Sequence, residues 1–119
     1  MFYAKHYSEV KLEKVNVDGA KNVKIRWMLD KNIGAKNFAM RLFEIGANGN
    51  TPFHEHPWEH EIFVVSGSGK LKLEDDEFEL SEGSIAYVPS DSKHQFISGD
   101  NGMKMICVIP NMGDKRDKG

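Results

Sequence analysis

The sequence predicts an all-β sandwich or barrel. Short runs rich in β-branched and aromatic residues recur along the chain, and glycine, asparagine, aspartate, serine and proline separate them, which is the pattern of strands and turns. No window of helical length shows a sustained apolar period of 3.6 residues, so we expect little helix. Closure into a barrel is favoured because it removes most exposed strand edges.

Nine segments have the length and composition of strands. They are residues 22–28, 38–45, 51–56, 60–66, 70–74, 77–80, 84–89, 93–98 and 103–109. A chain of 119 residues is the size of one domain, so we expect a single domain over residues 1–119. Its polar end, "NMGDKRDKG", predicts a frayed tail over about residues 111–119.

Composition argues against several classes of function. The net charge of −2 and the isoelectric point near 6.2 give no general attraction to nucleic acid or anionic membranes. The longest apolar runs fall far short of the roughly 20 residues that span a bilayer. Cys107 is the only cysteine, so no intrachain disulfide can form, and the N-terminus lacks the apolar core of a signal peptide. We therefore expect a cytoplasmic protein without a nucleic-acid or membrane partner.

Three of the five histidines, His54, His56 and His60, lie within seven positions. On an extended strand His54 and His56 point to the same face, because side chains alternate. His60 would lie about 13 Å beyond His56 on a continuous strand, so the chain must bend between them, and Pro57 suits a bend. A helix with His56 and His60 one turn apart is disfavoured because Pro57 would sit inside that turn. We interpret the cluster as imidazoles that converge from two strands, a ligand type suited to transition metals.

The histidine-bearing stretches resemble the two motifs of the cupin superfamily. The first motif is matched at Gly49, His54, His56 and Gly67, with His60 where the family usually has its glutamate ligand. The second is matched in "GSIAYVPSDSKHQFIS" at Gly83, Pro89 and His94, while Asp91 and Ser98 replace the usual glycine and asparagine. The run "HEHPWEHE" in particular is similar to small single-domain cupins with four histidine ligands.

This resemblance implies an antiparallel double-stranded β-helix, or jelly-roll barrel, that binds one divalent transition metal ion per chain. The implied ligands are His54, His56, His60 and His94. Glu61 is the alternative to His60 if the bend ends one residue later. The resemblance leaves manganese, iron, zinc, nickel and copper open, because ligand type alone does not choose among them. We favour manganese or iron.

Alternation on residues 38–45 predicts that one arginine faces the interior. Glu44 marks the outer face of this strand, so Arg41 points inward. A charge there needs a carboxylate or an anionic ligand. Arg41 is therefore either an anchor for substrate or one half of a structural salt bridge.

The same alternation predicts further residues of the barrel interior. Lys104 faces water, which places on the inner face Met103, Met105, Cys107 and Ile109. The candidates to line a cavity are Ile62, Tyr87 and Phe96. We interpret Cys107 as a buried small hydrophobe rather than a nucleophile.

The ligand set predicts a metal-dependent enzyme. A divalent ion held by neutral imidazoles keeps its full charge and, in octahedral geometry, has two positions open. We expect oxygenase-type chemistry on a small organic substrate that enters near Arg41 and Tyr87. An isomerase-type cupin and a non-catalytic module that binds a metal or small ligand are the alternatives, because the fold hosts unrelated functions.

Apolar side chains on the outer faces of two strands predict a homodimer. They are Phe38, Met40, Leu42, Phe63 and Val65. This is too much apolar surface to leave in water without a partner or a covering segment. The N-terminal region is a candidate to exchange between subunits and cover it.

Overall fold

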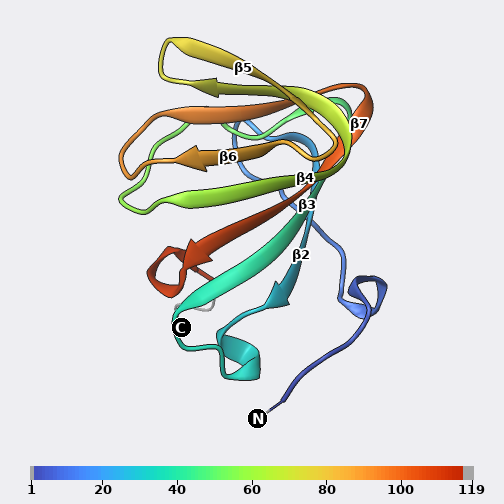
Figure 1. Ribbon diagram of the computed structural model, residues 1–119, viewed down its shortest axis with the longest axis vertical. Helices are drawn as coiled ribbons and strands as arrows, with labels where there is room; N and C mark the ends of the chain where they lie inside the picture. The colour runs from blue at the N-terminus through green and yellow to red at the C-terminus, as the bar shows by residue number, and fades with distance from the viewer. Residues whose placement is uncertain (1, 117–119) are drawn as a thin grey trace.

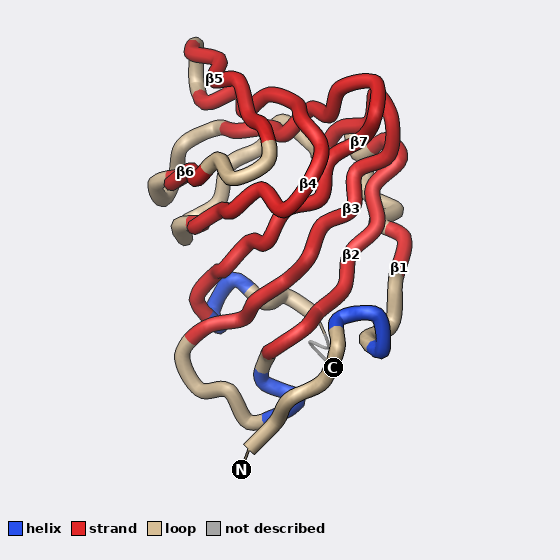
Figure 2. Tube along the Cα trace, turned by 45° about the vertical axis from the view of Figure 1, so that its right-hand side comes forward, coloured by secondary structure: helices blue, strands red, loops and turns tan. Residues whose placement is uncertain are grey.

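The computed structural model describes residues 2–116 as an antiparallel β-structure that curls into a jelly-roll barrel (Figure 1). Its strands are β1 (Glu13–Lys14), β2 (Lys21–Leu29), β3 (Phe38–Asn50), β4 (His60–Leu73), β5 (Asp76–Ser81), β6 (Ile85–Val88) and β7 (His94–Pro110). Three short 3₁₀ turns, η1 (Tyr7–Glu9), η2 (Lys31–Ile33) and η3 (Asn111–Gly113), lie at the end of the barrel away from β5 and β6 (Figure 2). The all-β prediction is confirmed. Among the described residues, no helix is long and apolar enough to cross a membrane.

Strand β7 lies at the centre of the sheet. The order of hydrogen-bonded strands is β1-β2-β3-β7-β4-β5, with β6 beside β4, and every pairing is antiparallel. Ile106 of β7, for example, is the register partner of Leu42 in β3 and of Phe63 in β4. The first part of β4 pairs with β6 and its second part with β5, while β7 accompanies both parts. β4 and β7 therefore connect β5 and β6 to the rest of the sheet.

Two predicted turns are bends within long strands. The structure joins the segments predicted at 60–66 and 70–74 into β4, and those at 93–98 and 103–109 into β7. Gly67 and Gly102 have φ angles of 81° and 76°, and the register between β4 and β7 shifts beside Gly67. A Cβ at Gly67 would overlap the Gly102 carbonyl. The glycines therefore permit a bulge and a close approach of two strands rather than a chain reversal.

The strand predicted at residues 51–56 is wrong. Within this segment only His54 forms a bridge, to His94, through backbone hydrogen bonds of 3.1 and 2.9 Å. The chain then bends at Pro57 and Trp58, and β4 begins at His60. The predicted bend is thus confirmed, although the segment before it is an irregular arm held against the start of β7.

The interior face predicted for β7 is confirmed. Met103, Met105, Cys107 and Ile109 are each no more than 2% exposed. Ile45 of β3 and Ile62 and Val64 of β4 belong to the same apolar core. The core occupies the barrel interior, and the histidine cluster lies at the point where β4 and β7 begin.

The prediction of a frayed tail is wrong for residues 111–116. Asn111 donates from its side chain to the Ala35 carbonyl at 3.0 Å, and Asp114 is 2% exposed. Ion pairs described below hold the segment against the end of β2. The rest of the predicted tail, residues 117–119, lies outside the described part of the chain.

Candidate metal centre and its cavity

Four histidines from three segments meet at one end of the barrel. His54 and His56 come from the irregular arm after β3, His60 is the first residue of β4, and His94 is the first residue of β7. The bridge between His54 and His94 joins the arm to β7. The Asp91 amide also donates to the His56 carbonyl at 2.8 Å. These backbone contacts give the irregular arm a fixed position although it lacks a strand ladder.

The imidazole nitrogens are close enough to share one ion. One ring nitrogen from each of His54, His56 and His94 lies within 4.8 Å of the others. The Nε2 atoms of His56 and His60 are 2.9 Å apart, and the ring centroids of His60 and His94 are 5.0 Å apart. A metal–nitrogen distance of roughly 2 Å requires donor atoms of one ion to lie a few ångströms apart, so this donor set fits a transition metal.

Burial keeps the imidazoles neutral. It is the main cause that lowers the pKa of His56 to about 4 and the pKa of His60 to about 2, and the Arg41 guanidinium adds to the effect on His60. Burial also lowers the pKa of His54 and of His94. Neutral imidazole is the form that binds metals. All four rings are therefore ready to coordinate at neutral pH.

Two of the rings have their second nitrogen oriented by a neighbour. His94 donates from Nδ1 to the Ser92 carbonyl at 2.8 Å, and His60 Nδ1 lies 3.0 Å from Cys107 Sγ. Such contacts leave Nε2 free for an ion, as is usual for metal-binding histidines. Trp58 stacks on the His56 ring with centroids 4.0 Å apart and an interplanar angle of 10°, which fixes the plane of a third ring.

Glu61, the alternative ligand, does not converge on the histidines. It is exposed on the outer side of β4, and its register partner on β6 is Tyr87. Tyr87 itself, predicted to line the cavity near its mouth, is 53% exposed and donates to Glu59 Oε2 at 2.5 Å. On β6 the side chain that is buried is instead Val88. The prediction that Tyr87 lines the cavity is therefore wrong.

A cavity of about 380 Å³ opens onto the histidines. Its walls are largely apolar and include Trp27, Phe43, Trp58, Phe96 and Met105. The prediction that Phe96 lines it is confirmed, whereas Ile62 is a core residue outside the lining. Both tryptophans were missed by the sequence analysis. The sequence offered a signal for Trp58, since it lies between His56 and His60 in "HPWEH".

Arg41 points into this cavity and is 8% exposed. Its Nη2 donates to Cys107 Sγ at 2.8 Å and lies 3.4 Å from His60 Nδ1. Its Nε is buried without a hydrogen-bond partner. Within the described residues no carboxylate pairs with Arg41. The inward orientation is confirmed, and the structural salt bridge is excluded for this part of the chain.

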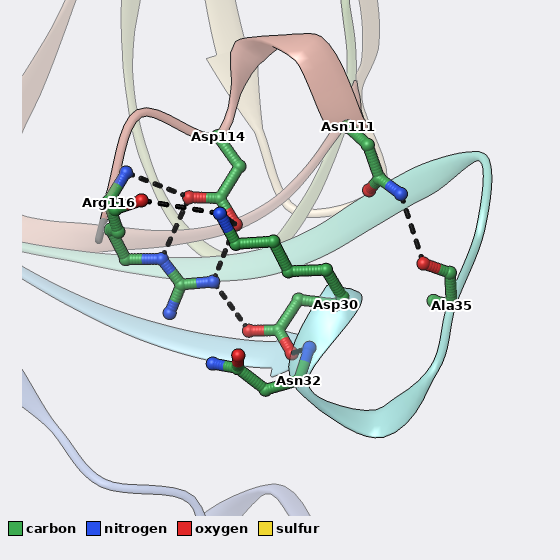
Figure 3. A network of polar contacts seen from close by, with 7 residues as sticks. Asp30, Asn32, Ala35, Asn111, Asp114 and Arg116 are labelled. Carbon is green, nitrogen blue, oxygen red and sulfur yellow. Dashed lines mark hydrogen bonds and ion pairs between the residues drawn. The ribbon is translucent and has the colours of Figure 1, made fainter. Parts of the chain in front are cut away.

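A second arginine, Arg116, lines the cavity from the C-terminal segment. Its guanidinium contacts Asp30 Oδ2 at 2.6 Å and Asp114 Oδ2 at 2.7 Å (Figure 3). The guanidinium carbon also lies 3.5 Å from the centroid of the Trp27 ring. The C-terminal segment is thus fastened to the end of β2, and sequence reasoning missed this contact because its partners are 86 positions apart.

The chain belongs to the cupin family. A family profile described as a cupin domain matches residues 41–109, which is more than half of the chain. An uncharacterized protein from Methanocaldococcus jannaschii is 30% identical over 88 residues, which cover 70% of this chain and 69% of that protein. The predicted cupin resemblance is confirmed, as is the small jelly-roll fold.

Solved structures agree with this assignment. The polyketide cyclase RemF from Streptomyces resistomycificus is 36% identical and has a TM-score of 0.88, with 93% of this chain and 80% of RemF covered. A predicted oxalate decarboxylase from Thermotoga maritima is 20% identical with a TM-score of 0.80, covering 91% of this chain and 98% of that protein. The second likeness concerns the fold alone.

Proposed function

We propose that the protein is a metal-dependent cupin enzyme that acts on a small, largely apolar organic molecule. The observation that carries this proposal is the meeting of a neutral histidine cluster with a cavity of about 380 Å³. Pockets of a few hundred cubic ångströms with apolar walls and a few polar groups are typical of small-molecule sites. A histidine site of purely structural purpose would have no need of such a cavity.

The proposed ligands are His54, His56, His60 and His94. Three of them form the compact set described above, and the contact of 2.9 Å between His60 and His56 supports a fourth ligand. Manganese or iron is the proposed metal, with zinc, nickel and copper as alternatives. When bound, the ion supplies Lewis-acid polarisation of a substrate oxygen or, for manganese and iron, redox chemistry with dioxygen.

The protein's own residues supply binding and exclusion of water. The apolar walls remove water from the reacting atoms, which strengthens every electrostatic contact inside. Trp58 and Phe96, which line the cavity together with the histidines, bind the body of the substrate. Trp58 also holds the plane of His56 through its stacking contact. The apolar cavity walls therefore orient the substrate, and the histidine cluster holds the ion that supplies the chemistry.

Two reaction classes fit this arrangement. The chain is 36% identical to a polyketide cyclase, with a TM-score of 0.88. This similarity favours a reaction at a carbonyl carbon of an apolar substrate, and such a reaction consumes no oxidant. Oxygenase-type chemistry is the second candidate, because an all-imidazole ligand set offers no carboxylate to offset the ion's charge. Consumption of dioxygen separates the two classes.

The test begins with elemental analysis of protein purified without added metal. Wild type is compared with alanine variants of the four histidines and with His6→Ala, whose exposed ring caps η1 and does not line the cavity. We expect about one ion per chain in wild type and His6→Ala and sharply less in the four variants. Manganese, iron and zinc forms are then screened with polyketide-like carbonyl compounds while oxygen uptake is recorded. Full metal content in the four variants would overturn the proposal.

We also propose that the protein assembles as a homodimer through the outer face of β3, β7, β4 and β6. Exposed apolar side chains on this face are Phe38, Phe63, Val65 and Ile85, of which Ile85 is 78% exposed. Leu42, expected on this surface, is instead only 5% exposed. A dimer sedimenting at micromolar concentration, converted to monomer by Phe63→Glu with Ile85→Glu, is the expected result. A wild-type monomer would contradict it.

A further inference from the structure

We infer that the substrate carries one anionic oxygen, a carboxylate or an ionised enol, on an otherwise apolar planar body, and that Arg41 binds this oxygen through its guanidinium group. The inference deepens the proposed function. It rests on the proposal that this cavity is the substrate site, but it does not depend on which reaction takes place there. Its support comes from the charge of Arg41, from its hydrogen bonds and from the character of the cavity walls.

The first support is an uncompensated charge. Arg41 is 8% exposed, and a buried guanidinium is costly unless an anion pairs with it. Its polar neighbours are the Cys107 thiol and the neutral His60 ring, and neither carries a countercharge in its neutral form. No Asp or Glu is among the cavity-lining residues of the described chain. The missing countercharge must therefore come from whatever occupies the cavity.

The second support is an unused donor. The Nε atom of Arg41 is buried and has no hydrogen-bond partner, and such orphaned donors are rare in folded proteins. Nε has no free surface in this conformation, but Arg41 lines the cavity beside the histidines, so a bound molecule can meet its guanidinium group there. A charge-assisted hydrogen bond to an anionic oxygen would compensate the charge and give the guanidinium group an acceptor that it lacks.

The third support is the shape and polarity of the walls. The guanidinium carbon lies 5.3 Å from the centroid of Trp27 and 4.9 Å from that of Phe43. Trp58 and Phe96 line the same space. Aromatic walls favour a flat, conjugated body, and the near absence of free polar groups disfavours sugars and small dicarboxylates. Arg41 is the arginine of the cavity that has no carboxylate partner among the described residues, so it can pair with one anionic oxygen at one end of the substrate.

The experiment compares anionic and neutral probes of one shape. We would use calorimetry to measure the binding of 2-naphthoate, of neutral 2-naphthalenemethanol, and of 2-hydroxy-1,4-naphthoquinone, whose enol is ionised at neutral pH. Each probe is tested on the zinc-loaded and on the metal-free protein. The wild type is expected to bind at least one of the two anions about tenfold or more tighter than the neutral alcohol, and which anion is preferred identifies the oxygen.

The variants test whether Arg41 causes the preference. Arg41→Met should abolish it in the metal-free protein, Arg41→Lys should keep part of it, and the control Arg26→Met should leave it unchanged. Arg26 pairs with Glu44 outside the cavity lining. Because Arg41→Met also removes an unpaired buried charge, its melting temperature without ligand should equal or exceed that of wild type. A lower melting temperature together with an unchanged anion preference would mean that Arg41 is purely structural.

The outcomes separate this inference from the proposed function. In one outcome, the zinc form of Arg41→Met still prefers the anionic probes, and the metal-free protein does not. The ion then binds the anion, so the inference is wrong and the metal-dependent function stands. In another outcome, the preference for anionic probes depends on Arg41, but no metal-dependent turnover is found. This result supports the inference and overturns the proposal that the protein is an enzyme. Equal affinity for anionic and neutral probes in the wild type overturns the inference outright.

Discussion

Two arginines line the same cavity, and their surroundings differ in one respect. Arg116 contacts the carboxylates of Asp30 and Asp114 at 2.6 and 2.7 Å, whereas Arg41 has no carboxylate partner among the described residues. Both guanidinium groups face the ring of Trp27, at 3.5 and 5.3 Å from its centroid. The Arg116 side chain is 29% exposed and Arg41 is 8% exposed, so we call the end of the cavity at Arg116 its mouth and the end at Arg41 and the histidines its base. The chain thus provides countercharges at the mouth and none at the base.

The difference shows how a structural charge can be distinguished from a binding charge. At the mouth, the paired arginine fastens the C-terminal segment to the end of β2, so its binding capacity is already used (Figure 3). At the base, the unpaired arginine lies beside the histidine cluster, and its Nε donor has no hydrogen-bond partner. Substitutions at the base should therefore change binding with little loss of stability, and substitutions at the mouth should do the reverse.

The largest effect is expected at the base, from His94→Ala. His94 lies beside all three other histidine rings, so its loss should lower metal affinity by more than the roughly 100-fold typical of losing a supporting contact. Arg116→Met should leave the metal content at the wild-type level. Chelator competition followed by elemental analysis measures both. Comparable losses of bound metal in His94→Ala and Arg116→Met would contradict the distinction between base and mouth.

The next effect separates His60 from its neighbour in sequence. His60→Ala should lower metal affinity because its Nε2 faces the other ligands, while Glu61→Ala, on the outer side of β4, should not. Titration with cobalt, followed by its visible absorption, reports both affinity and ligand number. Retained cobalt affinity in His60→Ala with loss in Glu61→Ala would contradict the ligand assignment.

A smaller effect is expected at the mouth, from Asp114→Ala. The Asp114 side chain is buried and accepts from Arg116, so its removal should lower the free energy of unfolding by about 1.5–3 kcal/mol, the range for hydrogen bonds to a charged group. Urea denaturation of the metal-free protein measures the change. Glu77→Ala, which breaks an exposed pair with Lys70, is the control and should cost less than about 1 kcal/mol. Equal costs would show that the mouth contact contributes no more than a surface pair.

The smallest effect concerns acid pH. The hydrogen bonds from Arg116 hold the pKa of Asp114 below its ordinary value of 3.8. The unfolded chain therefore takes up a proton at this carboxyl before the folded chain does, so the stabilisation is fully present above pH 3.8 and is lost as pH falls through the folded-state pKa. Urea denaturation between pH 5 and pH 3 should show a shallower decline for Asp114→Asn than for wild type. Parallel declines would contradict the pKa direction.

The sequence predicted the base of the cavity better than the mouth, for physical reasons. The histidines lie close together in the chain, and charged residues fixed the phase of the strands around them: Glu44 and Lys104 marked outer faces, which placed Arg41 and Cys107 inside correctly. The segment "SIAYVP" contains no charged residue. Its alternation fits either face, and the face predicted for Tyr87 was wrong.

The mouth depends on partners that local patterns do not reveal. Asp114 and Arg116 read as a polar tail because solvated and paired charges have the same composition. Their partner Asp30 lies near the other end of the chain, at the N-terminal cap of η2. Likewise, Gly67 and Gly102 predicted turns because a bulge and a turn use the same residue type, and only the pairing of β4 with β7 distinguishes them.

The central position of β7 has a consequence for synthesis of the protein on the ribosome. β7 follows every other strand in the chain, yet it lies between β3 and β4 in the sheet. Until its residues emerge, β3 and β4 each expose an unpaired edge, and such edges invite association between chains. His94 is the first residue of β7, so the last histidine of the cluster emerges as the closing strand begins. Nascent chains that stop before residue 94 are therefore the form of this protein most in need of chaperones.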